Sequence, residues 1–328
     1  MNAALAPVLA ELFGPGTLVG LRRIAGGASK EAWALDYEAS GQRWPLLLRR
    51  AAGGVIYRHT LSLEHEFRVL QAAFAAGVRV PRPYRYLADL EGREAFLVER
   101  LEGESIGRRV VTRPELESAR EQLPRALAAE LAKIHALSLG ELAFLPGPGA
   151  EPATAWLLRE LYAELDALDE PHPALELALR WLADHPPRPL PLVVCHGDFR
   201  VGNLLIGPEG LRAVLDWEFA HRGDPREDLS WPLVRAWRFG RDDQRLGGVG
   251  AVEPFVAHYN ALTGRNVTVD ELGWWELFGN VRWGVGALAQ ARRHLRGEAR
   301  DLELAVLGRL AAEMEYEMLA LLARQTGE

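Results

Sequence analysis

The sequence predicts an α+β protein of two lobes, a small β-rich lobe with one helix followed by a large, mainly helical lobe. Short apolar runs separated by glycines and polar turns fill the first hundred residues, and amphipathic helical patterns dominate after them. The change falls near 101–104, which gives an N-terminal lobe at 1–101 and a C-terminal lobe at 102–328. At 328 residues, 48% of them apolar, the chain is long enough for this arrangement and for a full-sized core.

The elements of the first lobe follow from periodicity. The run "EAWALDY" at 31–37 alternates between two faces, as a strand does, and "PLLLRR" at 45–50 is a compact apolar run typical of a buried strand. The segment 61–78 instead has apolar residues at helical spacing and reaches a glycine near its end, which predicts a helix. A further strand is expected at 94–103.

The second lobe is predicted to be helical at 124–137, 153–168 and 174–185, and again from about 232 to the end. One apolar segment interrupts the helices. Its run "LVVC" predicts a short buried strand, and "NLLI" and "LRAVLD", joined by the turn "GPEG", predict the two arms of a β-hairpin.

Three polar side chains stand in that segment at Asp198, Asn203 and Asp216. A hairpin brings its ends together, so Asn203 is expected to approach Asp216, and Asp198 is five residues away from Asn203. Carboxylate and amide oxygens are hard ligands suited to Mg²⁺. A second carboxylate that binds no metal can accept a proton from a hydroxyl that attacks phosphorus. The pattern therefore indicates phosphoryl transfer.

Other polar residues nearby are expected to be structural. His196 is predicted to brace the loop before Asp198, and Asp224 and Asp228 to cap or tie the following helix. Cys195, the single cysteine, excludes an intramolecular disulfide and a multi-cysteine metal site, and its apolar setting predicts a small buried side chain.

The stretches "HGDFRVGNLLI" and "AVLDWEFAHRGDPREDLSW" resemble the aminoglycoside phosphotransferase and choline kinase family, small-molecule kinases with a protein-kinase-like fold. The likeness is greatest to the subgroup of kinase-like domains associated with acyl-CoA dehydrogenases. It implies that Asp198 is the catalytic base, or the group that orients the attacking hydroxyl, and that Asn203 and Asp216 hold Mg²⁺. It also implies ATP (or GTP) as phosphoryl donor and a hydroxyl of a small molecule as acceptor.

The same resemblance implies a phosphate-covering loop at "GGASKEAW". Glycine lets backbone N–H groups approach phosphate oxygens closely, so Gly26 and Gly27 are candidates for that contact, and the Ser29 hydroxyl can donate to phosphate. The loop departs from the Gly-x-Gly-x-x-Gly pattern of protein kinases.

A lysine is expected on the third strand of such a lobe, but Arg49 and Arg50 stand there instead. The resemblance aligns Arg49 with the phosphate-binding cation and Glu66 with its helical ion-pair partner, while the choice between the two arginines stays open. An arginine fork can grip phosphate and carboxylate. The resemblance also places the adenine-binding hinge at Glu99 to Leu101.

Two alternatives stay open for the acceptor. Five tryptophans could form an aromatic cage for a choline-like cation, or else belong to the core: Trp231, Trp237, Trp274, Trp275 and Trp283. Five arginines instead favour an anionic acceptor, such as a hydroxy acid or its CoA thioester: Arg235, Arg238, Arg282, Arg292 and Arg293. Residues 230–328 carry about as many arginines as acidic residues, so no acidic surface for an aminoglycoside is predicted.

The remaining expectations concern partners and competing functions. A net charge of −7 argues against a general nucleic-acid binder, and the sequence contains neither a leader pattern nor a membrane-length apolar run. We therefore expect a cytoplasmic monomer or homodimer. The alternatives are a catalytically silent kinase-like nucleotide-binding protein, favoured by the missing lysine, and a metal-dependent hydrolase using His196, Asp198 and Asp216 with His221.

Overall fold

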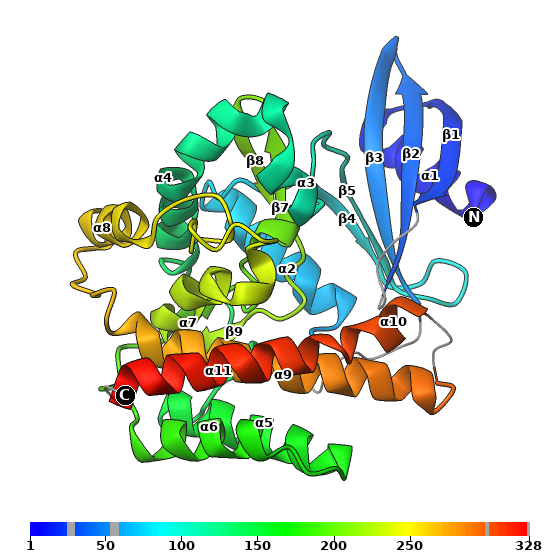
Figure 1. The fold of residues 1–328 in the computed structure, drawn as a ribbon. Helices are drawn as coiled ribbons and strands as arrows, with labels where there is room; N and C mark the ends of the chain where they lie inside the picture. Colours follow the sequence, from blue (N-terminus) through cyan, green and yellow to red (C-terminus); the bar gives the residue numbers. More distant parts are fainter. Residues whose placement is uncertain (25–29, 53–58, 299–301, 327–328) are drawn as a thin grey trace.

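The computed structural model describes residues 1–24, 30–52, 59–298 and 302–326 (Figure 1). A sheet with its helices forms one lobe, and a larger helical body forms the other. The predicted α+β architecture of two lobes is therefore confirmed. None of the helices in the described ranges has both the length and the apolar character needed to cross a membrane.

The first lobe is built on one antiparallel sheet in the order β1-β2-β3-β5-β4. Its strands are β1 (Gly16–Ile24), β2 (Lys30–Ala39), β3 (Gln42–Ala51), β4 (Pro83–Leu87) and β5 (Ala95–Glu99). The alternation expected at 31–37 is confirmed, because Leu35 and Tyr37 pack on one face with Leu46 and Leu48. Residues of β2 and β3 on the opposite parity, including Lys30 and Arg49, therefore share the other face.

Each face of the sheet carries a helix. The helix α2 (Leu63–Ala75) is close to its predicted position, and its N-terminus is capped by Ser62, whose Oγ accepts the His65 N–H at 3.2 Å. The helix α1 (Asn2–Phe13) was not predicted, so the lobe has two helices rather than one. Its sequence has an internal proline and no side-chain cap, and burial of Leu5 and Leu9 against the sheet holds it in place.

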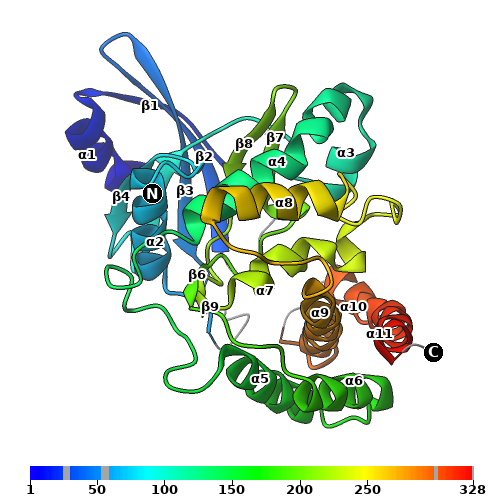
Figure 2. The ribbon, with the colours of Figure 1, turned by 90° about the vertical axis from the view of Figure 1, so that its left-hand side faces the viewer.

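The second lobe contains most of the helices. They are α3 (Gly107–Thr112), α4 (Glu117–Ile134), α5 (Ala153–Leu168), α6 (Pro173–Asp184), α7 (Pro225–Ser230), α8 (Val252–Thr263), α9 (Leu272–Leu295), α10 (Leu302–Leu307) and α11 (Leu310–Thr326). The long helices α9 and α11 pack side by side and are seen end-on in Figure 2, with α5 and α6 beneath them. On the other side, α4 packs against α8.

The segment between α6 and α7 folds as predicted. β6 (Val193–Cys195) pairs with β9 (His221–Gly223), and β7 (Leu204–Gly207) pairs with β8 (Gly210–Val214) in a hairpin. A short 3₁₀ turn, Val201–Asn203, leads into β7. Two more such turns, Trp231–Leu233 and Arg235–Trp237, follow α7.

One apolar cluster joins the two lobes, because Phe67 of α2 and Phe96 of β5 belong to the same cluster as Leu131 of α4 and Phe199 beside the hairpin. A second cluster lies among α5, α6, α9 and α11. The hairpin and its flanking loops are thus fixed between the sheet and the helices.

Phe255 on α8 tests the first cluster. Its side chain is 0% exposed, so Phe255→Ala removes a ring that the surroundings cannot replace and should destabilise the protein by about 3–5 kcal/mol. The same change at Phe74, which is 42% exposed on α2, should cost less than about 1 kcal/mol. Urea unfolding of both variants measures the difference, and equal losses would contradict this account of the core.

Candidate active site

The predicted convergence of Asp198, Asn203 and Asp216 is found. Asn203 donates from Nδ2 to the backbone carbonyl of Asp198 at 3.0 Å and to its carboxylate Oδ2 at 2.5 Å. The Leu215 N–H donates to the Asn203 carbonyl at 2.8 Å, which extends the hairpin and places the next residue, Asp216, beside Asn203. The three residues therefore lie at one end of the hairpin.

Two further residues hold the Asp198 carboxylate, and neither was predicted for this position. The Trp231 indole Nε1 donates to Oδ1 at 2.6 Å, and the Arg200 Nε donates to the same oxygen at 3.0 Å. The Arg200 guanidinium also lies over the Trp237 ring, 4.4 Å from its centroid. Both carboxylate oxygens of Asp198 thus accept hydrogen bonds from side chains.

His196 braces the loop, as expected. Its Nε2 is 3.0 Å from the Leu215 carbonyl, to which it donates, and its Nδ1 accepts the Asp198 N–H at 3.2 Å. This arrangement requires a neutral imidazole, and burial lowers the pKa of His196 accordingly. Both ring nitrogens are used inside the loop, so His196 is not positioned as a metal ligand.

Asp228 does more than tie its own helix. Its carboxylate accepts the backbone N–H groups of His196 at 2.6 Å and Gly197 at 2.9 Å, and Nε2 of His135, which caps the C-terminus of α4, contacts it at 3.2 Å. Burial alone would raise the pKa of Asp228, but the hydrogen bond from His135 and the surrounding donors lower it. Gly197 has φ +79°, and a Cβ there would lie 2.3 Å from the Phe219 carbonyl oxygen, so glycine is required.

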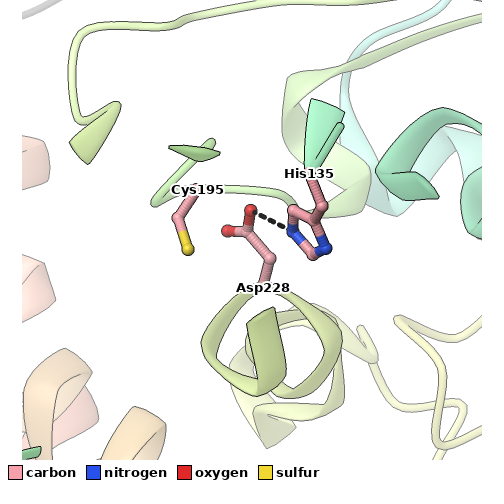
Figure 3. A group of neighbouring side chains, drawn as sticks. All are labelled: His135, Cys195 and Asp228. Atoms are coloured by element: carbon pink, nitrogen blue, oxygen red, sulfur yellow. Dashed lines mark hydrogen bonds and ion pairs between the residues drawn. The ribbon is translucent and has the colours of Figure 1, made fainter. Parts of the chain in front are cut away.

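Figure 3 shows His135, Cys195 and Asp228 close together, a spacing that a metal ion could span. The chemistry argues against a metal centre. The Cys195 Sγ donates to the Asp224 carbonyl at 3.5 Å, and burial raises the pKa of this thiol well above its usual value, whereas a metal ligand needs the thiolate. The Asp228 carboxylate already accepts three hydrogen bonds, so the group is structural.

The remaining predictions for this segment are met in part. Asp224 caps α7 by accepting the Arg226 N–H at 3.0 Å and forms a buried ion pair with the Arg226 guanidinium. His221 has Nδ1 3.0 Å from the Phe219 carbonyl and Nε2 2.9 Å from a Glu227 oxygen. Both nitrogens therefore donate, which removes His221 as a ligand for the hydrolase alternative.

The first lobe contributes two cations to the same place. Arg49 Nη2 is 3.0 Å from Asp216 Oδ1. Burial opposes its charge, but the carboxylates of Asp216, Glu66 and Glu218 raise the pKa of Arg49 further above its usual range. Arg50 points elsewhere, toward the carbonyls of Leu90 and Glu91, because neighbouring strand residues face opposite sides. Of the two arginines, Arg49 faces the site.

Lys30 is the second cation, and its role was not predicted from the sequence. Its Nζ forms a buried ion pair with Glu66 and lies 3.0 Å from Glu218 Oε2. The expected partner of Glu66 was Arg49, but Lys30, which lies on the same sheet face, takes that place. Strand alternation could have placed Lys30 on the face of Ala32, whereas no local pattern shows which residue of that face meets Glu66.

Several charged side chains lie close to Asp216. Burial favours the neutral acid, but Arg49 and Lys30 lower the pKa of the Asp216 carboxyl. Burial and the adjacent Asp216 raise the pKa of Glu218, against the attraction of Lys30. Three carboxylates, from Glu66, Asp216 and Glu218, thus surround two cations.

The other predicted nucleotide contacts are only partly described. Gly26, Gly27 and Ser29 lie outside the described residues. Glu99 ends β5, and its N–H donates to the Arg82 carbonyl at 2.9 Å, so that N–H is already used. Leu101 lies in the connection between the lobes, just before Glu104 pairs with Ile206 of β7.

The tryptophans divide into two groups. Trp274 and Trp275 are buried in the second cluster, and Trp274 donates to the Leu182 carbonyl at 3.1 Å. Trp231 and Trp237 belong to the same cluster, but they form a row with Trp283 that begins at Asp198: Trp231 contacts Trp237 at a centroid separation of 5.6 Å, and Trp237 contacts Trp283 at 4.7 Å.

The faces of two of these rings carry the protein's own cations. Arg200 lies over Trp237, and the Arg282 guanidinium lies 4.7 Å from the Trp231 centroid. These guanidinium groups occupy positions that a choline-like ligand would need.

Most of the five arginines are paired. Arg235 contacts Glu317 and Asp242, Arg238 contacts Glu276, Arg282 contacts Glu227 and Arg293 contacts Gln290. Arg292 has no carboxylate partner in the described part of the chain, and its Nη1 is buried there without a hydrogen bond. Among the five, Arg292 and Arg293 therefore have no carboxylate partner in the described part of the chain.

Comparison with known proteins places the chain in a family. Residues 20–263 match the family model of the phosphotransferase enzyme family, abbreviated APH, so the chain belongs to that family. Among curated proteins, acyl-CoA dehydrogenase family member 10 of Mus musculus is 30% identical over 293 residues, which are 82% of this chain and 26% of that protein. Family member 11 of Homo sapiens is 28% identical, over 67% of this chain and 30% of that protein. The chain thus spans less than a third of these relatives.

Solved structures give the fold. A structure from Ralstonia eutropha JMP134 assigned to the aminoglycoside phosphotransferases has a TM-score of 0.75 at 21% identity, covering 97% of this chain and 98% of that one. Spectinomycin phosphotransferase, in complex with ADP and spectinomycin, has a TM-score of 0.63 at 15% identity, covering 96% and 98%. The predicted protein-kinase-like fold is therefore confirmed.

Asp228 provides a test of the site's framework. Asp228→Asn replaces one acceptor oxygen by an NH₂ group that faces backbone donors, so we expect a loss of about 3 kcal/mol in the free energy of unfolding. Asp243→Asn, an exposed carboxylate 3.6 Å from Arg241, should change it by less than about 0.5 kcal/mol.

The pH dependence separates the charge from the shape of Asp228. Because the folded pKa lies below the unfolded value of about 3.9, the ionised carboxylate stabilises the fold above that pH and loses this effect as the pH falls through the folded pKa. Asp228→Asn should therefore show a shallower loss of stability on acidification than wild type. Parallel curves would contradict a stabilising charge.

Proposed function

We propose that the protein is a small-molecule kinase that transfers the γ-phosphoryl group of ATP to a hydroxyl, with Mg²⁺. The observation that carries the proposal is the meeting of Asp198, Asn203 and Asp216 with Lys30 and Arg49 from the other lobe. Residues 1–101 would form the nucleotide lobe and residues 102–328 the catalytic and acceptor lobe. Family membership supports phosphotransfer, and related folds have been solved with ADP, GDP and AMP-PNP.

The donor set fits Mg²⁺. Both hydrogen bonds of the Asn203 amide are made by its nitrogen, which leaves the amide oxygen as a ligand, and Asp216 supplies a carboxylate. The excess of carboxylates over cations around Asp216 also favours a divalent cation. When bound, Mg²⁺ would neutralise charge on the β- and γ-phosphates.

The chain's own groups supply positioning and proton transfer. The acceptor oxygen forms a bond to the γ-phosphorus as the bond from phosphorus to the β,γ-bridging oxygen breaks, and the hydroxyl proton passes to Asp198. Lys30 and Arg49 would attract the phosphates, with Glu66 and Glu218 holding Lys30 in place. The amides of Gly26 and Gly27 and the Ser29 hydroxyl would cover the phosphates.

The adenine would bind at the connection between the lobes. Because the Glu99 N–H is already used, the contacts would come from the Glu99 carbonyl and from the backbone of Leu101. The choice between ATP and GTP would depend on these backbone groups.

For the acceptor we favour an anion, such as a hydroxy acid or a hydroxyacyl-CoA thioester. The Trp231 and Trp237 faces are already covered by arginines, which disfavours a choline-like cation, and neither Arg292 nor Arg293 has a carboxylate partner in the described part of the chain. The curated relatives are named as acyl-CoA dehydrogenase family members, of which this chain matches 26% and 30%. The alternative of a catalytically silent protein was favoured by the absence of a lysine on the third strand. Because Lys30 and Arg49 both supply positive charge at the site, that absence is weaker support for it.

Asp198→Ala tests the proposed base. We expect it to lower kcat by at least about 10³-fold, because the proton acceptor is lost, while the Kd for Mg²⁺·ATP changes little. Turnover is measured as ADP release across aminoglycosides, choline, sugars, hydroxy acids and hydroxyacyl-CoA thioesters. Turnover of an anionic acceptor that survives in the variant would contradict the role of Asp198.

The same panel decides between the proposals. Turnover of choline or aminoglycosides alone would overturn the anionic acceptor but keep the kinase. Tight binding of Mg²⁺·ATP without turnover would favour the catalytically silent nucleotide-binding protein. Absence of nucleotide binding would contradict both the kinase and the silent alternative.

Asp216→Asn tests the metal role. The amide keeps the size of the side chain but loses the charge, so the gain in ATP affinity produced by Mg²⁺ should fall by about tenfold or more. Calorimetric titration of ATP with and without Mg²⁺ measures it, with Asp184→Asn, an exposed carboxylate 3.8 Å from Arg180, as control. An unchanged Mg²⁺ effect would argue against Asp216 as a ligand.

A further inference from the structure

We propose that Trp231 is a positioning residue for Asp198, whose indole N–H fixes the carboxylate in the orientation that receives the acceptor hydroxyl. The inference rests on the proposed kinase function. Its basis is the 2.6 Å contact from Trp231 Nε1 to Asp198 Oδ1 across 33 residues of sequence. A hydrogen bond from a neutral donor to a carboxylate is directional, so it selects one rotamer of the aspartate.

Trp231 is itself held firmly. Its side chain is 6% exposed, packed beside Trp237, and the Arg282 guanidinium covers one face at 4.7 Å from the ring centroid. A guanidinium over an indole face is a favourable electrostatic contact, which strengthens where water is excluded. The ring therefore cannot turn without losing both contacts.

Arg282 is anchored in turn by a buried chain of charges. Its Nη1 donates to Glu227 Oε1 at 2.9 Å, and the other oxygen of Glu227 accepts from His221 Nε2 at 2.9 Å. Burial opposes a charge on His221, but Glu227 raises its pKa, in keeping with two donating nitrogens. The orientation of Trp231 is thus linked to β9 and α9 through ionic contacts rather than by apolar packing alone.

Arg200, the second donor to Asp198 Oδ1, is more exposed than Trp231. The Arg200 side chain is 25% exposed and contacts Oδ1 at 3.0 Å, longer than the tryptophan contact. An acceptor hydroxyl that donates to Asp198 needs room at the carboxylate, and Arg200 can leave toward solvent or phosphate. Trp231 has no such freedom, so it is the donor that remains during turnover.

The chain offers a matched control in Trp274. Its indole N–H also makes one buried hydrogen bond, to the Leu182 carbonyl at 3.1 Å, and it belongs to the same apolar cluster as Trp231. Phenylalanine at either position removes an indole N–H and part of a ring from this cluster. Only the change at position 231 removes a contact to Asp198.

The kinetic experiment compares Trp231→Phe with Trp274→Phe. We expect Trp231→Phe to lower kcat about 10- to 100-fold with the KM for ATP within about twofold, because only the orientation of the base changes. Trp274→Phe should leave kcat within about threefold of wild type. Equal effects on kcat, or an effect of Trp231→Phe confined to KM, would overturn the inference.

A second variant covers the case in which Trp231→Phe folds poorly. Replacing Trp231 with 3-benzothienylalanine by genetic code expansion exchanges the N–H for sulfur and keeps the ring that Arg282 covers. The same loss of kcat is expected. Normal kcat in this protein would show that the ring, and not its N–H, matters, and would overturn the proposal.

NMR of the indole N–H groups tests the contact without any acceptor substrate. Among the ten tryptophans of ¹⁵N-labelled protein, the indole signal that disappears in Trp231→Phe should be the one that moves most in Asp198→Ala, and the Trp274 signal should stay in place. An unmoved Trp231 signal overturns the inference. A moved signal without turnover of any acceptor would instead mean that the contact exists and that the proposed function has failed.

Discussion

The site depends on one buried carboxylate. Asp228 is fully buried, and a buried charge is tolerable only when its oxygens are hydrogen-bonded. Its partners are the backbone N–H groups of His196 and Gly197, so satisfying the charge also fixes the two residues that precede Asp198. His135, bonded in turn to the Tyr259 hydroxyl at 2.7 Å, ties the same carboxylate to α4 and α8. The loop geometry is therefore set by the lobe's core and not by the loop alone.

The two lobes meet through charge as well as through the shared apolar cluster. Lys30 connects Glu66 of α2 with Glu218, which follows the hairpin, and Arg49 contacts Asp216. Both cations come from the sheet, and each contacts a carboxylate that follows β8, namely Glu218 for Lys30 and Asp216 for Arg49. Because both cations lie on one sheet face, a change in the angle between the lobes would alter both pairs at once. Under the proposed function, the phosphates of the nucleotide would add further negative charge to this balance.

The sequence could predict those parts of the structure that depend on local pattern. Alternation placed Leu35 and Tyr37 on one face, the "GPEG" turn placed the hairpin, and the hairpin brought Asn203 to Asp216. What it could not predict depends on pairing between distant segments. The packing of α2 against the sheet decides that Lys30, rather than Arg49, pairs with Glu66, and the packing of the turn after α7 decides that Trp231 reaches Asp198. The helix α1 was missed for the same reason, since its apolar residues find their partners only on the folded sheet.

The tryptophans of the second lobe show how position decides the role of one residue type. All of them bury apolar surface, but their indole N–H groups have different hydrogen-bond partners. Trp274 donates to a backbone carbonyl in the core and Trp231 donates to a carboxylate at the site, whereas the indole nitrogens of Trp237 and Trp283 are buried without a partner in the described part of the chain. Their π faces differ too, because Arg200 and Arg282 cover Trp237 and Trp231. Held by Arg282 and packed beside Trp237, Trp231 thus orients Asp198, and under the proposed function the acceptor would be recognised mainly by charge.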